Sequence, residues 1–351
     1  LPANGSASFP FGVWSKLQRQ VMLDLGQKLL LPLPNRGLPE LRRAIAEHLH
    51  SFRGMKVSEE NILIGAGTDF LYNLLIQLLG RDICYGVEEP GYEKIRKIYT
   101  AGGVTWKSIP MDAQGVLPEK LQDANVLHIS PSHHFPTGAV TSLPRRQALL
   151  AWAREAENRW IIEDDYDSEF RFGLHPMPTM YSLDSQGKVI YMNTFSMTLA
   201  PSIRISYMVL PGALMAQFQQ KLGFYSCTVP SFEQYTLARF LQEGYFEKHL
   251  NRLRKFYKAR RNRVKAAIAG SSLADRVAIE EADAGLHFIL RVDTKLSDEE
   301  LVSFCENKGF RVRALSSYYH RAVPEKARRC LVINYSGLQE EELARLEDIL
   351  N

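Results

Sequence analysis

The chain has 351 residues, of which 45% are hydrophobic and 23% are charged, with 23 Gly and 17 Pro, as in ordinary globular proteins. Its 43 Lys and Arg against 39 Asp and Glu leave a net charge of +4, which gives no support to a nucleic-acid-binding surface spread over the whole chain. No stretch approaches the ~18 uncharged apolar residues of a membrane span, so none is predicted. At this length we expect one large and one smaller domain.

Apolar spacing predicts the elements of the first part of the chain. An N-terminal arm and a short helix occupy residues 1–30, and a second helix follows Pro39 and ends at Gly54. Beyond it, strand-like and helical runs alternate. The strand-like runs are residues 61–65, 83–85, 126–129, 160–162, 189–192 and 205–210, and the helical runs are residues 69–79, 92–99 and 145–156.

Short buried strands separated by helices are typical of a mostly parallel sheet covered on both faces, whose ligands bind at the strand ends. The pattern changes after Gly244, where a long basic helix, two strand-like runs and an amphipathic segment predict a smaller α+β domain. We therefore expect an arm over residues 1–30, a large domain over residues 31–245 and a small domain over residues 246–351.

The basic helix carries eight Lys or Arg within residues 252–265. An apolar stripe runs between these cations, which indicates a solvated helix face. The alternative is a DNA-facing surface in a longer parent protein, which steep salt dependence of DNA binding would reveal.

Cysteine usage indicates a reducing compartment. Cys84, Cys227, Cys305 and Cys330 are far apart and form no C-x-x-C pair. With no secretory leader, the cytoplasm is the expected location. The first residue is Leu1 and not Met, so we expect the chain to be a trimmed piece of a longer protein.

Two predicted strand ends carry unusual residues. Residues 65–68 (GAGT) lie between a strand and a helix, where free backbone N–H groups favour a phosphate, although tight packing is the alternative. Residues 163–169 (EDDYDSE) follow another strand. No His or Cys stands at ligand spacing nearby, so no metal site is predicted. The acidic run is either a solvated loop or a source of a carboxylate that faces a protonated ring nitrogen.

Two more segments decide between these interpretations. Residues 131–138 (PSHHFPTG) and 194–204 (TFSMTLAPSIR) each follow a strand, and residues 88–92 read EEPGY. In this order the segments resemble the pyridoxal-phosphate aminotransferases of the aspartate aminotransferase fold (fold type I). The sequence is most similar to the aminotransferase-like domains of the MocR branch of GntR-type bacterial regulators. The resemblance covers essentially the whole chain, including residues 9–14, 204–211 and 284–287.

The resemblance implies a binding site for pyridoxal 5′-phosphate. Asp164 matches the carboxylate that keeps the ring nitrogen protonated, Tyr166 matches the tyrosine that hydrogen-bonds the ring hydroxyl, and Tyr92 matches the aromatic residue that stacks on the ring. The residues that match the phosphate cup are Gly67, Thr68, Thr194, Ser196 and Arg204. A core tyrosine and a surface ion pair are the structural alternatives for Tyr92 and Arg204.

The sequence departs from the family pattern in three places, and the first two concern the residues around the cofactor ring. His133 and His134 stand near the position of the asparagine that touches the ring hydroxyl in most members, and a structural role is the alternative for both. Met197 occupies the position of the lysine that forms the Schiff base and shuttles protons. A side chain without nitrogen can do neither, so the chain should bind the cofactor non-covalently and should not turn over by the standard route. Met197 is either a laboratory substitution or a natural loss.

The third departure concerns the effector. The strand-like run 331–335 has no arginine for a substrate carboxylate, whereas Arg328 and Arg329 precede it and Lys94 follows Tyr92. These three are the candidate effector contacts, although adjacent arginines usually lie on a solvated edge. The effector is then an amino compound or the cofactor itself.

Three functions remain open at this point. The first is the cofactor- and effector-binding, homodimerising part of a MocR-type regulator, with a winged-helix DNA-binding domain outside this chain. The second is a stand-alone aminotransferase inactivated at Met197. The third is a binding module that has lost the cofactor, which the joint presence of Asp164, Tyr166 and Arg204 opposes.

Overall fold

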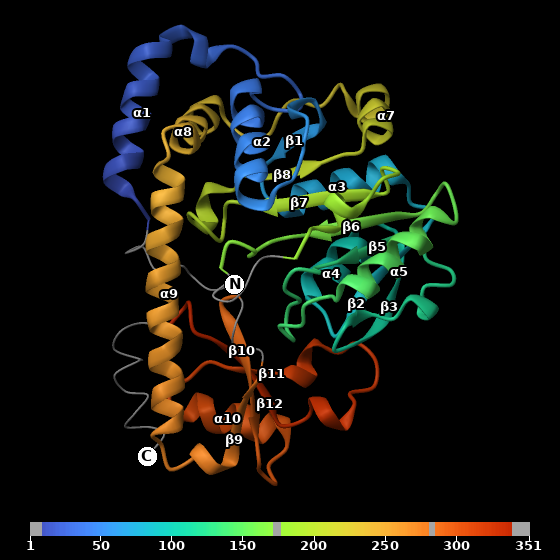
Figure 1. Ribbon diagram of the computed structural model, residues 1–351, viewed down its shortest axis with the longest axis vertical. Coiled ribbons are helices and arrows are strands. Elements are labelled where there is room, and N and C mark those ends of the chain that lie inside the picture. The colour runs from blue at the N-terminus through green and yellow to red at the C-terminus, as the bar shows by residue number, and fades with distance from the viewer. Residues whose placement is uncertain (1–8, 171–176, 281–284, 339–351) are drawn as a thin grey trace.

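The computed structural model describes residues 9–170, 177–280 and 285–338, which form two sheets and their covering helices (Figure 1). The strands of the large sheet are β1 (Ile62–Gly65), β2 (Cys84–Glu89), β3 (Thr105–Asp112), β4 (Gly115–Val116), β5 (Val126–Ile129), β6 (Trp160–Asp164), β7 (Val189–Thr194) and β8 (Ser206–Val209). Those of the small sheet are β9 (Val277–Glu280), β10 (His287–Val292), β11 (Arg313–Ala314) and β12 (Cys330–Asn334).

The large sheet has the strand order β1-β8-β7-β6-β5-β2-β3-β4. Strands β3, β2, β5, β6 and β7 are parallel, β8 is antiparallel to both β7 and β1, and β4 is antiparallel to β3. The carboxyl ends of β1, β2, β5, β6 and β7 therefore lie at one edge of the sheet, together with the start of β8. This is the mostly parallel sheet that the sequence predicts.

Helices cover both faces of this sheet, as the alternation of side chains along its strands requires. Ile162 packs with α3, α4 and α7 on one face, whereas its neighbour Ile161 packs with α5 and α6 on the other. The helices are α1 (Phe11–Leu25), α2 (Pro39–Arg53), α3 (Thr68–Leu79), α4 (Glu93–Ala101), α5 (Leu143–Arg154), α6 (Met180–Leu183), α7 (Gly212–Leu222), α8 (Ser231–Gln242), α9 (Tyr245–Ala269) and α10 (Asp298–Asn307).

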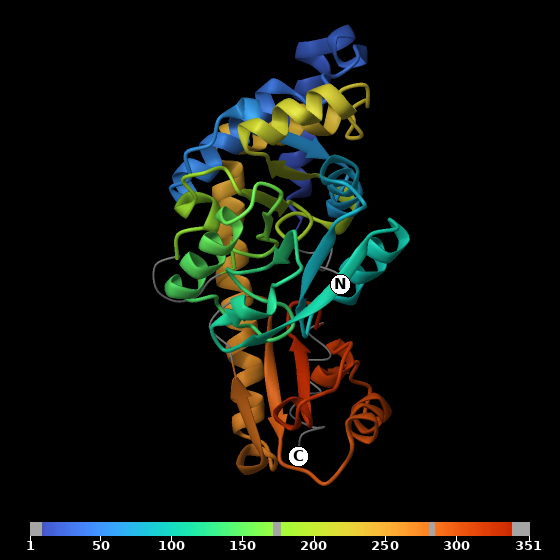
Figure 2. The same cartoon turned by 90° about the vertical axis from the view of Figure 1, so that its right-hand side faces the viewer.

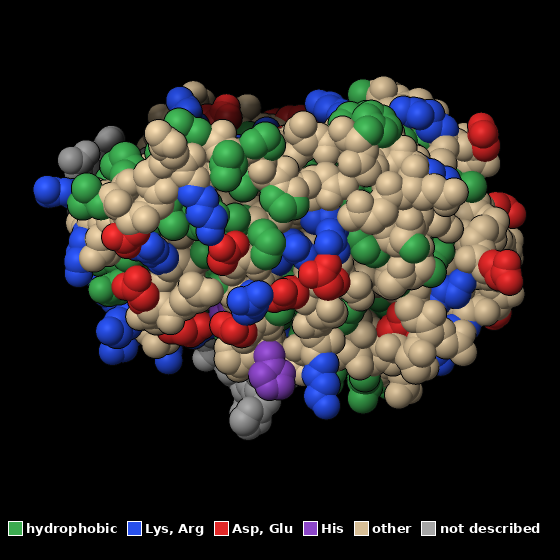
Figure 3. Space-filling model, turned by 90° about the horizontal axis from the view of Figure 1, so that it is seen from above, with side chains coloured by type: hydrophobic (Ala, Val, Ile, Leu, Met, Phe, Trp, Pro, Cys, Tyr) green, Lys and Arg blue, Asp and Glu red, His purple; other side chains and the backbone are tan. Residues whose placement is uncertain are grey.

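Helix α9 runs alongside both sheets, from α8 at one end to β9 at the other (Figures 1 and 2). Leu253, Tyr257 and Val264 are buried along one stripe of the helix. This is the amphipathic arrangement that the sequence predicts for the basic run. The face viewed from above mixes side chains of both charges (Figure 3).

The small sheet follows α9 in the chain. It is antiparallel in the order β11-β12-β10-β9, and α10 begins with a capping box between Ser297 and Glu300. Sequence patterns predict β10, β12 and α10 but not the short strands β9 and β11. Within the described residues, every helix is too short or too polar to cross a lipid bilayer.

The two domains are joined at the end of β2. Glu89 Oε1 accepts hydrogen bonds from the backbone N–H groups of His320 and Arg321, at 2.6 and 2.7 Å. The Gly91 N–H donates to the Tyr318 carbonyl at 3.1 Å. The segment that leads to Tyr92 is therefore bonded directly to the small domain.

Candidate functional site

The loops at the carboxyl edge of the large sheet bring the predicted site residues into one region. Tyr92 follows β2, His133 follows β5, Tyr166 follows β6 and Met197 follows β7, while Arg204 precedes β8. Because these loops leave neighbouring strands at the same edge, residues more than 100 positions apart in sequence meet there.

Asp164, the last residue of β6, is only 5% exposed. Its Oδ2 accepts a hydrogen bond from the Tyr72 hydroxyl and lies 3.4 Å from His128 Nε2. His128 Nδ1 lies in turn 2.7 Å from the Tyr99 hydroxyl. The other oxygen of Asp164, Oδ1, is buried without a hydrogen-bond partner among the described residues. A buried carboxylate oxygen without a donor is costly, so the site fits a ligand that donates a proton there.

The turn between β1 and α3 approaches Arg204 closely. Gly67 precedes the helix with φ +88°, and a Cβ built on it would overlap the Arg204 guanidinium. Glycine is required here for its conformation and for its lack of a side chain. The N-terminus of α3, which presents free N–H groups, and a guanidinium thus face the same space, an arrangement suited to an anion.

Hydroxyl groups lie on the adjoining strands β7 and β8. Thr194 Oγ1 accepts a hydrogen bond from the Ser206 hydroxyl at 2.8 Å and donates to Ser196 Oγ at 3.0 Å. Ser206 was missed by the sequence analysis, although its place two residues after Arg204 offered a signal.

Asp69 holds two cations beside this turn. Its Oδ2 lies 2.6 Å from Lys94 Nζ and 3.4 Å from Arg204 Nη2. Lys94 therefore belongs to the edge of the anion-binding region. Asp69 is a second residue that the sequence analysis missed.

Two histidines after β5 have different surroundings. His133 Nδ1 lies 2.8 Å from Asp167 Oδ2 and 3.3 Å from the Tyr166 hydroxyl, and its ring packs against Gly285 of the small domain. His133 is thus the histidine beside Tyr166. Burial raises the pKa of Tyr166 well above its ordinary value, so its hydroxyl keeps its proton.

His134 lies beside Glu88, with 3.5 Å between Nε2 and Oε2, and its Nδ1 lies 2.7 Å from the Thr137 hydroxyl. Burial lowers the pKa of His134 to about 3 and raises the pKa of Glu88 to about 8. Both groups are therefore mainly uncharged near pH 7, and the pair is not an ion pair.

The acidic run at the end of β6 is not a solvated loop, because all five of its carboxylates are buried. Asp165 Oδ2 accepts hydrogen bonds from Arg53 Nη2 and the Tyr191 hydroxyl, at 2.7 and 2.8 Å. Burial raises the pKa of Asp165, but the charge of Arg53 and these hydrogen bonds outweigh burial and hold it below its usual range. Burial raises the pKa of Glu169 to about 8.

Met197 is 8% exposed and packs in an apolar cluster. The other buried members of this cluster come from the end of the acidic run's loop, from α9 and from the small domain: Phe170, Leu253, Tyr257, Val264, Ile268, Leu286, Phe288 and Tyr335. The thioether is well suited to these surroundings.

Tyr92 lies at the boundary between the domains. Its ring is edge-on to Phe135 at a centroid distance of 5.9 Å, and Phe135 meets Tyr318 of the small domain at 5.2 Å. Burial raises the pKa of Tyr92, with a smaller contribution from Asp69.

Arg328 and Arg329 lie elsewhere. Both form ion pairs with Glu325 ahead of β12. In the register of the small sheet, Asn334 pairs with His287, close to His133, whereas Cys330 pairs with Arg291 at the opposite end. The structure therefore does not bring these two arginines to the strand ends that hold the other candidates.

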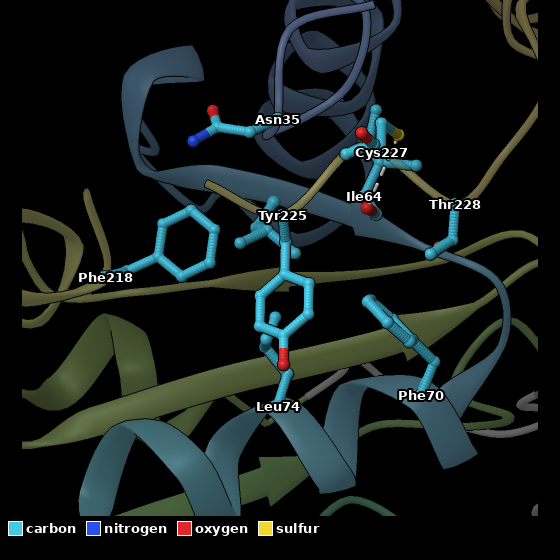
Figure 4. A pocket seen from close by; sticks show the side chains of 10 residues that line it. Asn35, Ile64, Phe70, Leu74, Phe218, Tyr225, Cys227 and Thr228 are labelled. Atoms are coloured by element: carbon cyan, nitrogen blue, oxygen red, sulfur yellow. Dashed lines mark hydrogen bonds between the residues drawn. The ribbon is translucent and has the colours of Figure 1, made fainter. Parts of the chain in front are cut away.

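A separate small hollow lies behind the β1–α3 turn (Figure 4). Ile64, Phe70, Leu74 and Phe218 give it a mainly apolar lining. Thr228, at its rim, accepts a hydrogen bond from the Ala66 N–H at 3.0 Å and so supports the turn. Within the described residues, no group of three or more His, Cys, Asp or Glu is arranged to hold a metal ion.

Comparisons with known proteins agree with this geometry. Residues 3–350 match the family described as aminotransferase class I and II. The chain is 36% identical over 340 residues to the uncharacterized HTH-type transcriptional regulator YdeL of Bacillus subtilis (strain 168), which covers 96% of this chain and 72% of that protein. It is 32% identical over 340 residues to the probable rhizopine catabolism regulatory protein MocR of Rhizobium meliloti, covering 96% and 68%.

Among solved structures, the multiple substrate aminotransferase of Thermococcus profundus has the same fold. The TM-score is 0.84 at 24% identity, over 100% of this chain and 89% of that one.

Proposed function

We propose that this chain binds pyridoxal 5′-phosphate without a covalent bond and senses an amino compound. The chain belongs to the class I and II aminotransferase family and is an aminotransferase-like domain of the MocR/GntR-type regulators. It would act as the dimerising part of a cytoplasmic regulator that contacts DNA through a helix-turn-helix region. The observation that carries the proposal is the buried Oδ1 of Asp164, which has no donor among the described residues.

The residues at the strand ends fit this cofactor. Asp164 would accept a hydrogen bond from the protonated ring nitrogen, Tyr166 would hydrogen-bond the ring hydroxyl, and Tyr92 would lie against the ring. The phosphate would be held by the N-terminus of α3 and by cup residues that supply hydroxyl, backbone and guanidinium donors: Gly67, Thr68, Thr194, Ser196 and Arg204. When bound, the protonated ring can draw electrons from an attached amine.

The residues that position Asp164 support the same role. Tyr72 donates to Oδ2 and His128 lies against it, so both fix the carboxylate while Oδ1 stays available. This places the negative charge toward the space where the ring nitrogen would lie. A hydrogen bond to such a charged group contributes roughly 1.5–3 kcal/mol.

Met197 argues against standard transamination. Its side chain has no nitrogen to bond the cofactor or to remove a proton from a substrate carbon. His133 is held by Asp167 beside Tyr166 and is packed against Gly285. We therefore assign the domain to sensing.

The effector is proposed to meet Lys94. Its ammonium lies next to Asp69, close to Tyr92, and can exchange this partner for an anionic group of the effector. Because Arg328 and Arg329 lie at the far end of β12, we do not assign them to the effector.

Exposed apolar residues support self-association. Leu30 and Phe224 are 75% and 76% exposed, and Leu31 and Phe11 are also exposed. Where such side chains form one contiguous patch, they mark a protein interface. We propose a homodimer through the surface formed by residues 11–31 and 224–225.

The decisive experiment measures binding of pyridoxal 5′-phosphate by calorimetry to the chain and to the double variant Asp164→Ala/Arg204→Ala. We expect a loss of affinity of at least ~100-fold, since an ion pair and a phosphate contact are both removed. The variant Lys97→Ala, on the exposed face of α4, serves as the control. Unchanged affinity in the double variant would contradict the assignment of both residues.

A further inference from the structure

A single carboxylate lies against both cations of the anion-binding region. Asp69, the second residue of α3, places its Oδ2 2.6 Å from Lys94 Nζ and 3.4 Å from Arg204 Nη2. We infer that Asp69 is a specificity-determining residue, which competes with the phosphate group of a ligand for these cations and so limits how much that group adds to affinity.

The inference rests on the proposed function, because it concerns the same turn between β1 and α3. It deepens that function by naming the residue that keeps a phosphorylated ligand exchangeable. Met197 offers no amine for a covalent bond, so retention of the ligand depends on noncovalent contacts alone. Contacts between charged groups are the strongest of these, and Asp69 acts on them directly.

The guanidinium of Arg204 is only loosely engaged. Among the described residues, only its Nη2 has hydrogen-bond partners, and both bonds are long, at 3.5 Å to the Ala66 carbonyl and 3.4 Å to Asp69. Its backbone has φ +51°, in the left-handed region that is uncommon for residues other than glycine, and its side chain lies against Gly67. Arg204 therefore keeps donors for an incoming anion at the turn.

An anion that Arg204 accepts must lie close to Asp69. An oxygen at the ordinary hydrogen-bond distance of ~2.9 Å from Nη2 is at most about 6.3 Å from Asp69 Oδ2, since Nη2 itself lies 3.4 Å from that atom. Like charges at this separation repel each other by enough to weaken binding about tenfold, at the effective dielectric constant of a protein surface.

The balance of charge leads to the same conclusion. Lys94 and Arg204 bring two positive charges, and Asp69 cancels one of them. A phosphate monoester carries a charge of about −1.5 to −2 near pH 7, which two cations would match and one net charge does not. The shorter contact, to Lys94, keeps the carboxylate beside the cations.

Asp69 also stands in the first turn of α3, where a carboxylate complements the helix dipole. A purely structural role of this kind would affect the stability of the fold and would act alike on every ligand. Competition for the cations acts only on ligands that carry a phosphate. The ratio of the affinities for a phosphorylated ligand and its unphosphorylated form therefore separates the two roles.

The test uses pyridoxine 5′-phosphate and pyridoxine, which differ only in the phosphate and carry no aldehyde that could condense with a lysine. Calorimetry on the whole chain gives both dissociation constants, with displacement of the phosphorylated ligand where pyridoxine binds weakly. In Asp69→Asn, pyridoxine 5′-phosphate should bind about tenfold tighter, and pyridoxine should stay within about threefold of its affinity for the unchanged chain. The ratio of the two affinities should thus rise.

A variant of opposite charge and a matched control complete the test. Lys94→Met should lower the same ratio at least about threefold, because Asp69 then opposes the phosphate with one cation fewer. Asp82→Asn removes the same charge from an exposed residue just beyond the other end of α3 and should leave the ratio unchanged. Urea unfolding of each variant checks that the fold is retained.

Salt provides a second readout. The side chains of Asp69 and Arg204 are 35% and 45% exposed, so dissolved ions can screen the repulsion. The difference between Asp69→Asn and the unchanged chain should shrink as salt rises from about 50 to about 500 mM. A difference that does not depend on salt would show that the substitution acts through packing, which contradicts the inference.

The outcomes separate the inference from the proposed function. If pyridoxine 5′-phosphate binds but Asp69→Asn leaves the ratio of affinities unchanged or lowers it, Asp69 does not compete with phosphate, while the cofactor site stands. If neither pyridoxal 5′-phosphate nor pyridoxine 5′-phosphate binds the unchanged chain, the proposed function fails and the inference fails with it.

Discussion

Gly67 lies directly against the guanidinium of Arg204, so closely that a Cβ at residue 67 would overlap it. These residues are 137 positions apart and meet because β1 and β8 are neighbours in the sheet. The anion-binding region is therefore built by the sheet and not by one loop.

Gly67→Ala should displace Arg204 and weaken binding of pyridine phosphates. The added methyl meets the guanidinium, and alanine is strained at φ +88°. We expect a loss of at least about tenfold in affinity by calorimetry and ~1–2 kcal/mol in unfolding free energy. Gly212→Ala is the matched control, because an added Cβ there meets no atom within 4 Å. Equal behaviour of the two variants would contradict the close contact.

Tyr72→Phe should loosen Asp164 without creating a large cavity. The variant removes the hydroxyl that donates to Oδ2. A lost hydrogen bond to a buried carboxylate should cost about 1–3 kcal/mol of stability in urea unfolding, and it should weaken cofactor binding. Its effect on binding should vanish in an Asp164→Asn background, as a double-mutant cycle would show. Ser51→Ala, which removes an exposed hydroxyl bonded to the Glu47 carbonyl within α2, should be nearly neutral.

Stability should decrease as pH rises from about 6.5 to 8. Burial raises the pKa of Glu88 from 4.5 to about 8, so the folded chain holds a proton that the unfolded chain has released. The stability from this group is complete below pH 4.5 and is lost as pH rises through 8, by up to ~1.4 kcal/mol per pH unit. Glu169 acts in the same direction.

His134 acts in the opposite direction at lower pH. Burial lowers its pKa from 6.5 to about 3, so its stabilising contribution is present above pH 6.5 and is lost as pH falls.

Urea unfolding at several pH values tests the role of Glu88. The variant Glu88→Gln should lose less unfolding free energy between pH 6.5 and 8 than the unchanged chain. Glu119→Gln, at the surface, should keep the wild-type slope. A slope unchanged in Glu88→Gln would show that Glu88 does not carry the proton.

Phe224→Asp should disrupt self-association. The side chain is largely exposed next to Tyr225, and a charge there is incompatible with a buried interface. Light scattering coupled to gel filtration should report a monomer, or a dissociation constant raised at least about tenfold. Phe304→Asp, on α10, changes an exposed phenylalanine of the small domain and should leave the mass unchanged. A dimer that survives Phe224→Asp would place the interface elsewhere.

The alternation of apolar runs predicted the parallel sheet, because strands buried on both faces are apolar throughout. The comparisons confirm the family resemblance and the fold class. Strand β11 escaped prediction, since two residues carry no periodic signal.

Only the site residues that lie in the sequence motifs after the strands could be predicted, and the roles of these residues remain predictions. Two partners of Asp164 were missed. Tyr72 lies within an apolar helix, where the sequence pattern predicts a buried core residue. His128 offered a signal as a polar residue within a buried four-residue strand. Arg53 and Asp165 are 112 positions apart, and no local pattern joins them.

The two hydrogen bonds between Glu89 and the backbone of residues 320 and 321 have a consequence for the proposed sensing function. With the Gly91 N–H bonded to the Tyr318 carbonyl, the backbone next to Tyr92 belongs to both domains. A reorientation of the small sheet requires these bonds to break or Tyr92 to move with it. If a ligand binds at the strand ends and the small sheet reorients, ligand binding and the angle between the domains would be linked equilibria, in which each shifts the other by the same free energy.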